Sequence, residues 1–309
     1  MKKFTFSILL LLCLVPINLF ASGIKENTQK SLSDNGIISI EKTYTDSLNR
    51  EITIPKNVNT VISLGPNLTE IIATLKPEAL VGRTDYCDYP QWVQNVFSIG
   101  NLSSPNLEKI IEIDPDLVVG STHVKKETIG ALEKAGITTV SLYDSSSIEG
   151  SYKVVLDMGT LLNQEEKAQE IVKNMKAEIN EVSKTVAKLN KPKVYYIVSF
   201  GQYGEYTAGG NTFIGQMITL AGGNNIANDI KGWSFSLEKL VEDDPDIIII
   251  SQYRNEMENF LSTKPYNELR AVKEHHIYTI DNNKLDRQGI RNAEGVKDLA
   301  IIIHPEAFN

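Results

Sequence analysis

Short runs of β-branched and apolar residues alternate along this chain with segments in which apolar residues recur every three or four positions. Runs this apolar on both sides are typical of strands in a sheet that helices cover on both faces. The segments between them have the period of amphipathic helices. The pattern predicts an α/β protein with strands near 61–64, 116–121, 138–143, 194–200, 246–251 and 276–281.

The longest helical pattern lies between the third and fourth of these strands, and Pro192 closes it. Its apolar residues share one helix face: Ala168, Ile171, Val172, Met175, Ile179, Val182, Val186 and Leu189. At 1.5 Å per residue such a helix is roughly 30 Å long, which is enough to connect two lobes. An ordinary amphipathic surface helix would have the same period, so both interpretations stay open.

A repeat divides the chain around this helix. The segment 106–121 (NLEKIIEIDPDLVVGS) matches 236–251 (SLEKLVEDDPDIIIIS) at eight of sixteen positions. In each copy Asn106 or Ser236 can cap a short helix, Pro115 or Pro245 ends it, and a buried strand follows. The repeat predicts two similar, doubly wound α/β lobes joined by one long α-helix.

The N-terminus has the pattern of an export signal. Lys2 and Lys3 precede an apolar run that is too short to span a membrane and is followed by small residues. We assign 1–22 to a signal peptide, 23–36 to a flexible polar tether, 37–147 to the N-terminal lobe, 148–191 to the connecting helical segment and 192–309 to the C-terminal lobe. Cys13 lies inside the apolar run, which disfavours lipidation there. The protein is therefore expected outside the cytoplasm.

Composition excludes several classes of function. The formal net charge is −8 and becomes −10 without the signal segment, which disfavours nucleic-acid binding. Without Cys13, Cys87 has no partner for a disulfide. The glycines from Gly210 to Gly215 lack the Lys and Ser or Thr of a phosphate loop, and neither GxSxG nor HExxH occurs. We therefore do not expect an enzyme. We also expect the protein to be a monomer.

Each copy of the repeat carries a glutamate, Glu108 or Glu238, two residues after its capping position. Helices in such units begin near the carboxyl ends of the strands, where α/β proteins bind ligands and partners. Two lobes would thus present two related carboxylates on one rim. An acidic residue in a first helical turn also complements the helix dipole, so the pair has a structural explanation too.

The order and spacing of several motifs resemble the helical-backbone class of periplasmic binding proteins. These motifs are VISLGPNLTEIIATL at 61–75, DYCDYP at 85–90, both repeat copies, TAGGNTFIGQMITLAGGNNIA at 207–227 and DRQGIRNAEGVKDLA at 286–300. The resemblance implies a binding protein with no cofactor of its own. It would carry cobalamin, haem or a ferric siderophore in a cleft between its lobes to an ABC importer, made of a permease and an ATPase.

The resemblance also implies roles for individual residues. Glu108 and Glu238 match the glutamates that pair with arginines of the permease. Tyr86 and Trp233 resemble aromatic residues that line the cleft of cobalamin binders, and Arg287 resembles a polar cleft contact.

Other positions bear on the choice of ligand. Leu102 and Ser121 stand where two further aromatics are expected in cobalamin binders. Arg287 and Arg291 suit the carboxylates of haem or of a siderophore, and His123 could ligate haem iron. On balance the sequence slightly favours cobalamin or another corrinoid.

Two rival functions remain. A bare zinc or manganese ion needs several converging ligands, whereas the adjacent His275 and His276 would point to opposite faces of a strand. An α/β adhesion or structural surface protein would need neither a ligand cleft nor an importer. Binding of metal chelates distinguishes these functions.

Overall fold

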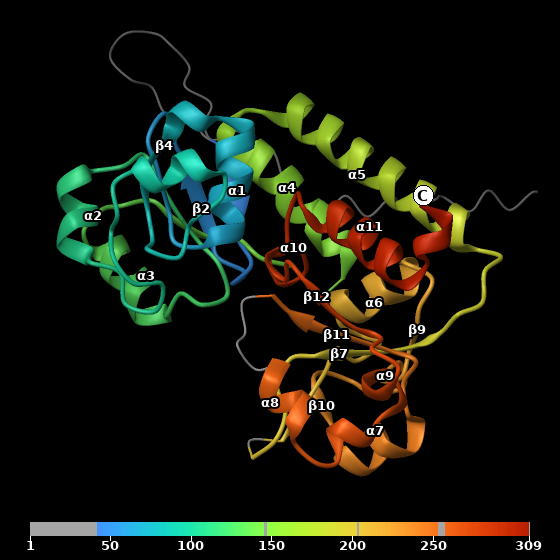
Figure 1. Cartoon of the computed structure of the whole chain (residues 1–309). Helices are drawn as coiled ribbons and strands as arrows, with labels where there is room; N and C mark the ends of the chain where they lie inside the picture. Colours follow the sequence, from blue (N-terminus) through green and yellow to red (C-terminus); the bar gives the residue numbers. More distant parts are fainter. Residues whose placement is uncertain (1–41, 145–146, 203, 253–256, 309) are drawn as a thin grey trace, which may run out of the picture.

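The protein consists of two α/β lobes, described here from a computed structural model (Figure 1). The structure describes residues 42–144, 147–202, 204–252 and 257–308. The predicted signal peptide, the tether and Cys13 lie outside these residues. Within these ranges, none of the helices combines the length and the apolar character that crossing a membrane requires.

The N-terminal lobe is built on a four-stranded parallel sheet with the order β4-β3-β5-β6. Its strands are β3 (Val61–Ser63), β4 (Leu80–Arg83), β5 (Leu117–Gly120) and β6 (Thr139–Ser141). A two-stranded antiparallel hairpin of β1 (Lys42–Thr45) and β2 (Glu51–Ile54) precedes the sheet. The helices of this lobe are α1 (Pro66–Leu75), α2 (Leu107–Ile113) and α3 (Lys126–Lys134).

The C-terminal lobe repeats this order in the parallel sheet β9-β7-β11-β12. Its strands are β7 (Lys193–Ile197), β9 (Asn224–Asn225), β11 (Ile247–Ser251) and β12 (Ile277–Ile280), and the short strands β8 (Glu205–Tyr206) and β10 (Ser234–Phe235) pair beside them. Its helices are α6 (Phe213–Leu220), α7 (Leu237–Asp243), α8 (Met257–Ser262), α9 (Arg270–Lys273), α10 (Asn283–Asp286) and α11 (Asn292–Ile303). Strands β3, β5 and β6 thus correspond to β7, β11 and β12, which confirms the two similar lobes.

The predicted connecting helical segment contains two helices, α4 (Ile148–Leu162) and α5 (Glu165–Val186). Asn163 adopts a left-handed conformation with φ 55° and ends α4. Helix α5 bridges the lobes: near its start Lys167 Nζ donates to the Leu75 carbonyl at 3.1 Å, and near its end Ser183 Oγ donates to the Leu220 carbonyl at 3.1 Å. The long connecting helix is therefore α5 alone, and its buried face agrees with the predicted one.

The two repeat copies fold in the same way. Asn106 and Ser236 cap α2 and α7 by accepting from the third backbone N–H of each helix. The helices end at Asp114 and Asp244, which both have positive φ. The following strands, β5 and β11, are fully buried, as the apolar runs predicted.

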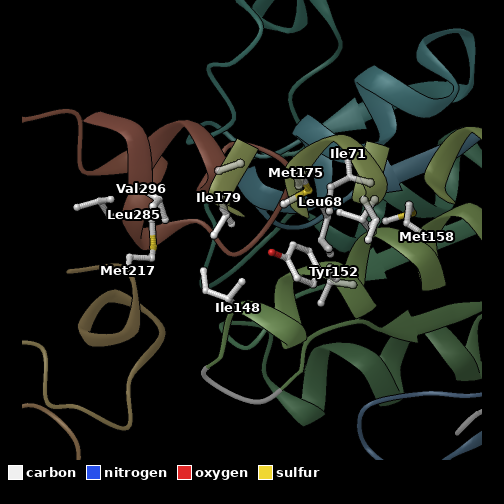
Figure 2. Close-up of a cluster of buried hydrophobic side chains, with 14 of the residues drawn as sticks. Leu68, Ile71, Ile148, Tyr152, Met158, Met175, Ile179, Met217, Leu285 and Val296 are labelled. Atoms are coloured by element: carbon white, nitrogen blue, oxygen red, sulfur yellow. The ribbon is translucent and has the colours of Figure 1, made fainter. Parts of the chain in front are cut away.

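The core continues from one lobe into the other. One face of each sheet packs against a shared set of helices, α1, α4, α5, α6, α10 and α11, and the other face packs against a separate core within its own lobe. Figure 2 shows part of the shared core, with Leu68 and Ile71 from α1 near Tyr152 from α4 and Met175 from α5. The shared core fixes the lobes to the same helices.

Candidate functional site

A buried carboxylate on α1 joins the N-terminal lobe to the segment between α10 and α11. Glu70 is 3% exposed. It accepts from Arg291 Nε at 2.8 Å and from Arg291 Nη2 at 2.7 Å, which is a two-point contact. Arg287 Nη1 lies 2.8 Å from the same carboxylate and 2.7 Å from Asp88 Oδ1. Both predicted cleft arginines are thus paired with acids.

Arg291 is held on every side by the protein. Its side chain is buried, its Nη1 lies 3.5 Å from Asp281 Oδ2, and its guanidinium carbon lies 4.1 Å from the ring centroid of Tyr89. Burial alone would lower the pKa of Arg291, but the Glu70 carboxylate raises it above its usual value. In this structure the charged Arg291 links α1 to the start of α11 through Glu70. A ligand could contact its guanidinium group only by replacing Glu70 or Asp281.

Arg287 is placed differently, because one of its two acidic partners is accessible. The Asp88 side chain is 49% exposed, whereas Glu70 is buried. An anionic ligand group could therefore replace Asp88 at Arg287 while Glu70 keeps its place. Arg287 is therefore better placed than Arg291 to contact a ligand.

The predicted aromatic contacts lie at the surface, one on each lobe. Tyr86 follows β4 and is 55% exposed, and Trp233 precedes β10 and is 36% exposed. The Trp233 carbonyl accepts from Thr207 N at 2.8 Å, which fixes the backbone beside β8. Exposed aromatic rings offer a flat apolar face with a polar edge, which suits a planar, partly apolar ligand.

Residues near the end of β5 differ in exposure. His123 is exposed, so its imidazole is accessible to a ligand. Ser121 is buried, and within the described ranges its Oγ has no hydrogen-bond partner. Its counterpart in the second lobe, Ser251, instead donates to Asn282. The Ser121 hydroxyl is therefore a free polar group at the carboxyl edge of the first sheet.

Sequence reasoning missed Glu70, Asp88 and Tyr89. A signal for Glu70 exists, because it lies among Leu68, Ile71 and Ile72 on the apolar side of α1, where an acid needs a buried partner. Asp88 and Tyr89 fall in the DYCDYP motif, of which we singled out only Tyr86.

Glu108 and Glu238 occupy matching places on the surface. Each is exposed in the first turn of its short helix, α2 or α7. No salt bridge to either glutamate is formed within the described part of the chain. Both carboxylates are thus available to a partner.

The described residues contain no group of three or more His, Cys, Asp or Glu side chains placed to hold a metal ion. His275 and His276 are exposed, and His276 Nδ1 lies 3.6 Å from Glu274. Cys87 is buried, and burial raises the pKa of its thiol despite a hydrogen bond of 3.0 Å from Thr69 Oγ1. These residues do not form a metal centre together.

Comparison with known proteins gives a match over both lobes. The family model described as periplasmic binding protein matches residues 61–284. The chain is 32% identical over 274 residues to an uncharacterized ABC transporter substrate-binding lipoprotein, YvrC, of Bacillus subtilis (strain 168), and 86% of each chain is covered. It is 29% identical over 280 residues to a cobalamin-binding protein of Halobacterium salinarum, covering 86% of this chain and 75% of the relative.

A solved structure has the same fold. The crystal structure of a possible iron-binding (periplasmic solute-binding) protein from Staphylococcus epidermidis ATCC 12228 superposes with a TM-score of 0.72. The sequences are 30% identical, and the match covers 81% of this chain and all of the other.

Proposed function

Because this chain belongs to the periplasmic binding protein family, we propose that it is the extracytoplasmic solute-binding protein of an ABC importer. It captures a metal chelate between its lobes and delivers it to the permease, which is coupled to an ATPase. The observation that carries this proposal is the family match across both lobes, together with the likeness to an ABC transporter substrate-binding lipoprotein. The predicted signal segment supports export and function at the outer face of the cytoplasmic membrane or in the periplasm.

Cobalamin or another corrinoid is the favoured ligand. Tyr86 and Trp233 offer one accessible aromatic ring on each lobe, which suits the faces and edges of a corrin ring. The relative from Halobacterium salinarum, which is named for cobalamin binding, supports this choice.

Haem or a ferric siderophore is the second candidate. Arg287 can exchange its contact with Asp88 for a ligand carboxylate, and His123 is accessible to haem iron. Leu102 and Ser121 also weaken the cobalamin assignment. The iron-binding description of the Staphylococcus epidermidis structure agrees with this alternative.

A panel of chelates tests the proposal. The purified protein without residues 1–22 is titrated with cyanocobalamin, haemin and several ferric siderophores, and binding is followed by calorimetry and melting temperature. A ligand at 100 times its Kd stabilises the folded state by about 2.7 kcal/mol, so we expect a rise of several degrees. Trp233→Ala and Tyr86→Ala should weaken corrinoid binding more than Arg287→Gln does, and the reverse order would favour an anionic chelate. If no chelate binds, the proposed function is wrong.

For delivery, we propose that Glu108 and Glu238 form ion pairs with arginines of the permease. One glutamate from each lobe would fix the orientation of the protein on the membrane and steer its approach. The exposure of both carboxylates supports this role.

A further inference from the structure

An apolar side chain accompanies each of the two exposed glutamates. Ile111 on α2 is 47% exposed and Val241 on α7 is 46% exposed. They occupy the same position of the repeat, directly after the buried Ile110 and Leu240. Ile110 and Leu240 are buried because they pack within their own lobes. Packing within the lobe does not explain why Ile111 and Val241 are apolar, because both are exposed.

Helix geometry places each apolar side chain beside its glutamate. Glu108 and Ile111 are three residues apart on α2, as are Glu238 and Val241 on α7, and residues at this spacing are neighbours on a helix surface. We call these two pairs the N-patch (Glu108 and Ile111) and the C-patch (Glu238 and Val241). Figure 1 shows α2 and α7 in different lobes, each on the side of its sheet away from α5.

Neighbouring lysines do not neutralise the patches. Lys109 Nζ lies 5.1 Å from the ring centroid of Phe97 and 3.4 Å from the Ser98 carbonyl. Lys239 Nζ lies 3.0 Å from Asp243 Oδ1. Among the described residues, neither Glu108 nor Glu238 has a salt-bridge partner, so each lobe presents an available carboxylate next to an exposed β-branched side chain. This combination complements a surface with a cation beside an apolar recess.

A single exposed isoleucine or valine is ordinary on a protein surface. Here, however, the same combination occurs in both lobes at equivalent positions, although the repeat retains only eight of sixteen residues. The next residue in each copy, Glu112 or Glu242, is exposed as well. A carboxylate alone would pair with an arginine without needing the apolar neighbour.

We propose that Ile111 and Val241 are docking contacts that insert into apolar recesses of the permease, one beside each arginine that pairs with Glu108 or Glu238. This inference rests on the proposed importer function and extends it. The ion pairs orient the protein, and burial of the two apolar side chains supplies affinity that salt does not screen.

The test measures binding to the permease–ATPase complex of the same organism in nanodiscs. The double variant Ile111→Ser/Val241→Ser should bind at least about tenfold more weakly than the wild type, as expected for the loss of two apolar contacts. The loss should be similar at low and high ionic strength. The control Ile301→Ser changes a side chain that is 41% exposed on α11, and should alter binding by less than about twofold. Unchanged melting temperatures exclude misfolding.

The outcomes separate this inference from the function on which it rests. If the wild type binds and Glu108→Lys/Glu238→Lys does not, but Ile111→Ser/Val241→Ser binds as the wild type does, the docking role of the apolar residues is wrong and the proposed function stands. If the serine variant loses affinity only at low ionic strength, its effect is electrostatic and the inference also fails. If the wild type does not bind the complex at all, both are wrong.

Discussion

Among single residues, Glu70 stands out because its carboxylate is buried. A buried carboxylate is tolerated because two guanidinium groups supply charge and hydrogen bonds. Its partners Arg287 and Arg291 are 217 and 221 residues away in the sequence, so local patterns could not reveal the pairing. The sequence analysis predicted Arg287 and Arg291 as ligand contacts, but it did not predict that they pair with Glu70.

Replacing Glu70 should be costly. Glu70→Gln removes the charge but leaves Arg287 and Arg291 near their positions, and breaking one partner of a buried ion pair typically costs 3–5 kcal/mol. We expect urea denaturation to show a loss of free energy of unfolding of about 3 kcal/mol. The control Glu165→Gln removes a surface pair with Lys42 and should cost less than about 1 kcal/mol. Equal effects of the two variants would contradict the assignment.

Asp46 gives the protein a dependence on pH. Its carboxylate accepts from Leu48 N at 2.9 Å and from Arg50 N and Ser141 N at 3.0 Å, which joins the β1–β2 turn to β6. Burial would raise the pKa of Asp46, but the hydrogen bonds from Arg50, Ser141 and Leu48 together lower it.

The pKa of Asp46 in the folded protein lies below its value of about 3.9 in the unfolded chain. The ionised carboxylate therefore stabilises the folded state at pH values above about 3.9, and this stabilisation is lost as pH falls through the folded-state pKa. Asp46→Asn should therefore be less stable than the wild type at pH 7, and the difference should shrink as pH falls below about 4. Melting temperatures measured from pH 7 to pH 3 provide the check. A difference that stays constant over this range would mean that the carboxylate charge is irrelevant.

At the scale of elements, the repeat explains more than the capping of two helices. Asp116 Oδ2 accepts from Asn59 N at 2.7 Å and from Thr60 N at 2.9 Å, just before β3. In the second lobe Asp246 Oδ2 accepts from Lys193 N at 2.6 Å, at the start of β7. The same aspartate thus fixes the start of the neighbouring strand in each sheet.

Alanine at either aspartate should leave backbone N–H groups without a partner and cost about 1–3 kcal/mol of unfolding free energy. Asparagine retains an acceptor oxygen, so Asp116→Asn and Asp246→Asn should recover part of the loss. Chemical denaturation of the four variants measures both effects. Equal destabilisation by alanine and asparagine would show that charge, rather than hydrogen bonding, matters here.

The helices and strands were predictable to different degrees. The repeat and the apolar runs predicted β5 and β11 well, because these strands are buried on both faces. The division of the connecting segment into α4 and α5 was missed, since it depends on the left-handed conformation of Asn163. The two-residue strands β8, β9 and β10 carry too few residues for a periodic signal.

At the scale of the whole molecule, the shared core restricts movement between the lobes. Helix α5 contacts both lobes, and the core that packs against it contains residues from each sheet. A large hinge rotation would have to expose this core. We therefore expect little closure between the lobes, so that the proposed ligand site would be largely preformed.

Small-angle scattering with and without a bound chelate tests this rigidity. We expect the radius of gyration to change by less than about 1 Å on binding, because closure is limited to small movements. A compaction of several ångströms would show that the shared core rearranges and that the site is not preformed.

The proposed delivery of a metal chelate to an importer can be measured as uptake of labelled chelate by cells. The chelate that binds in vitro is supplied to a strain from which the gene has been deleted. The wild-type gene should restore uptake, whereas Glu108→Lys/Glu238→Lys should not, although the purified variant binds the chelate as the wild type does. Full uptake by the deletion strain would show that the protein does not deliver the chelate, and full uptake by the charge-reversal variant would show that the two glutamates do not dock.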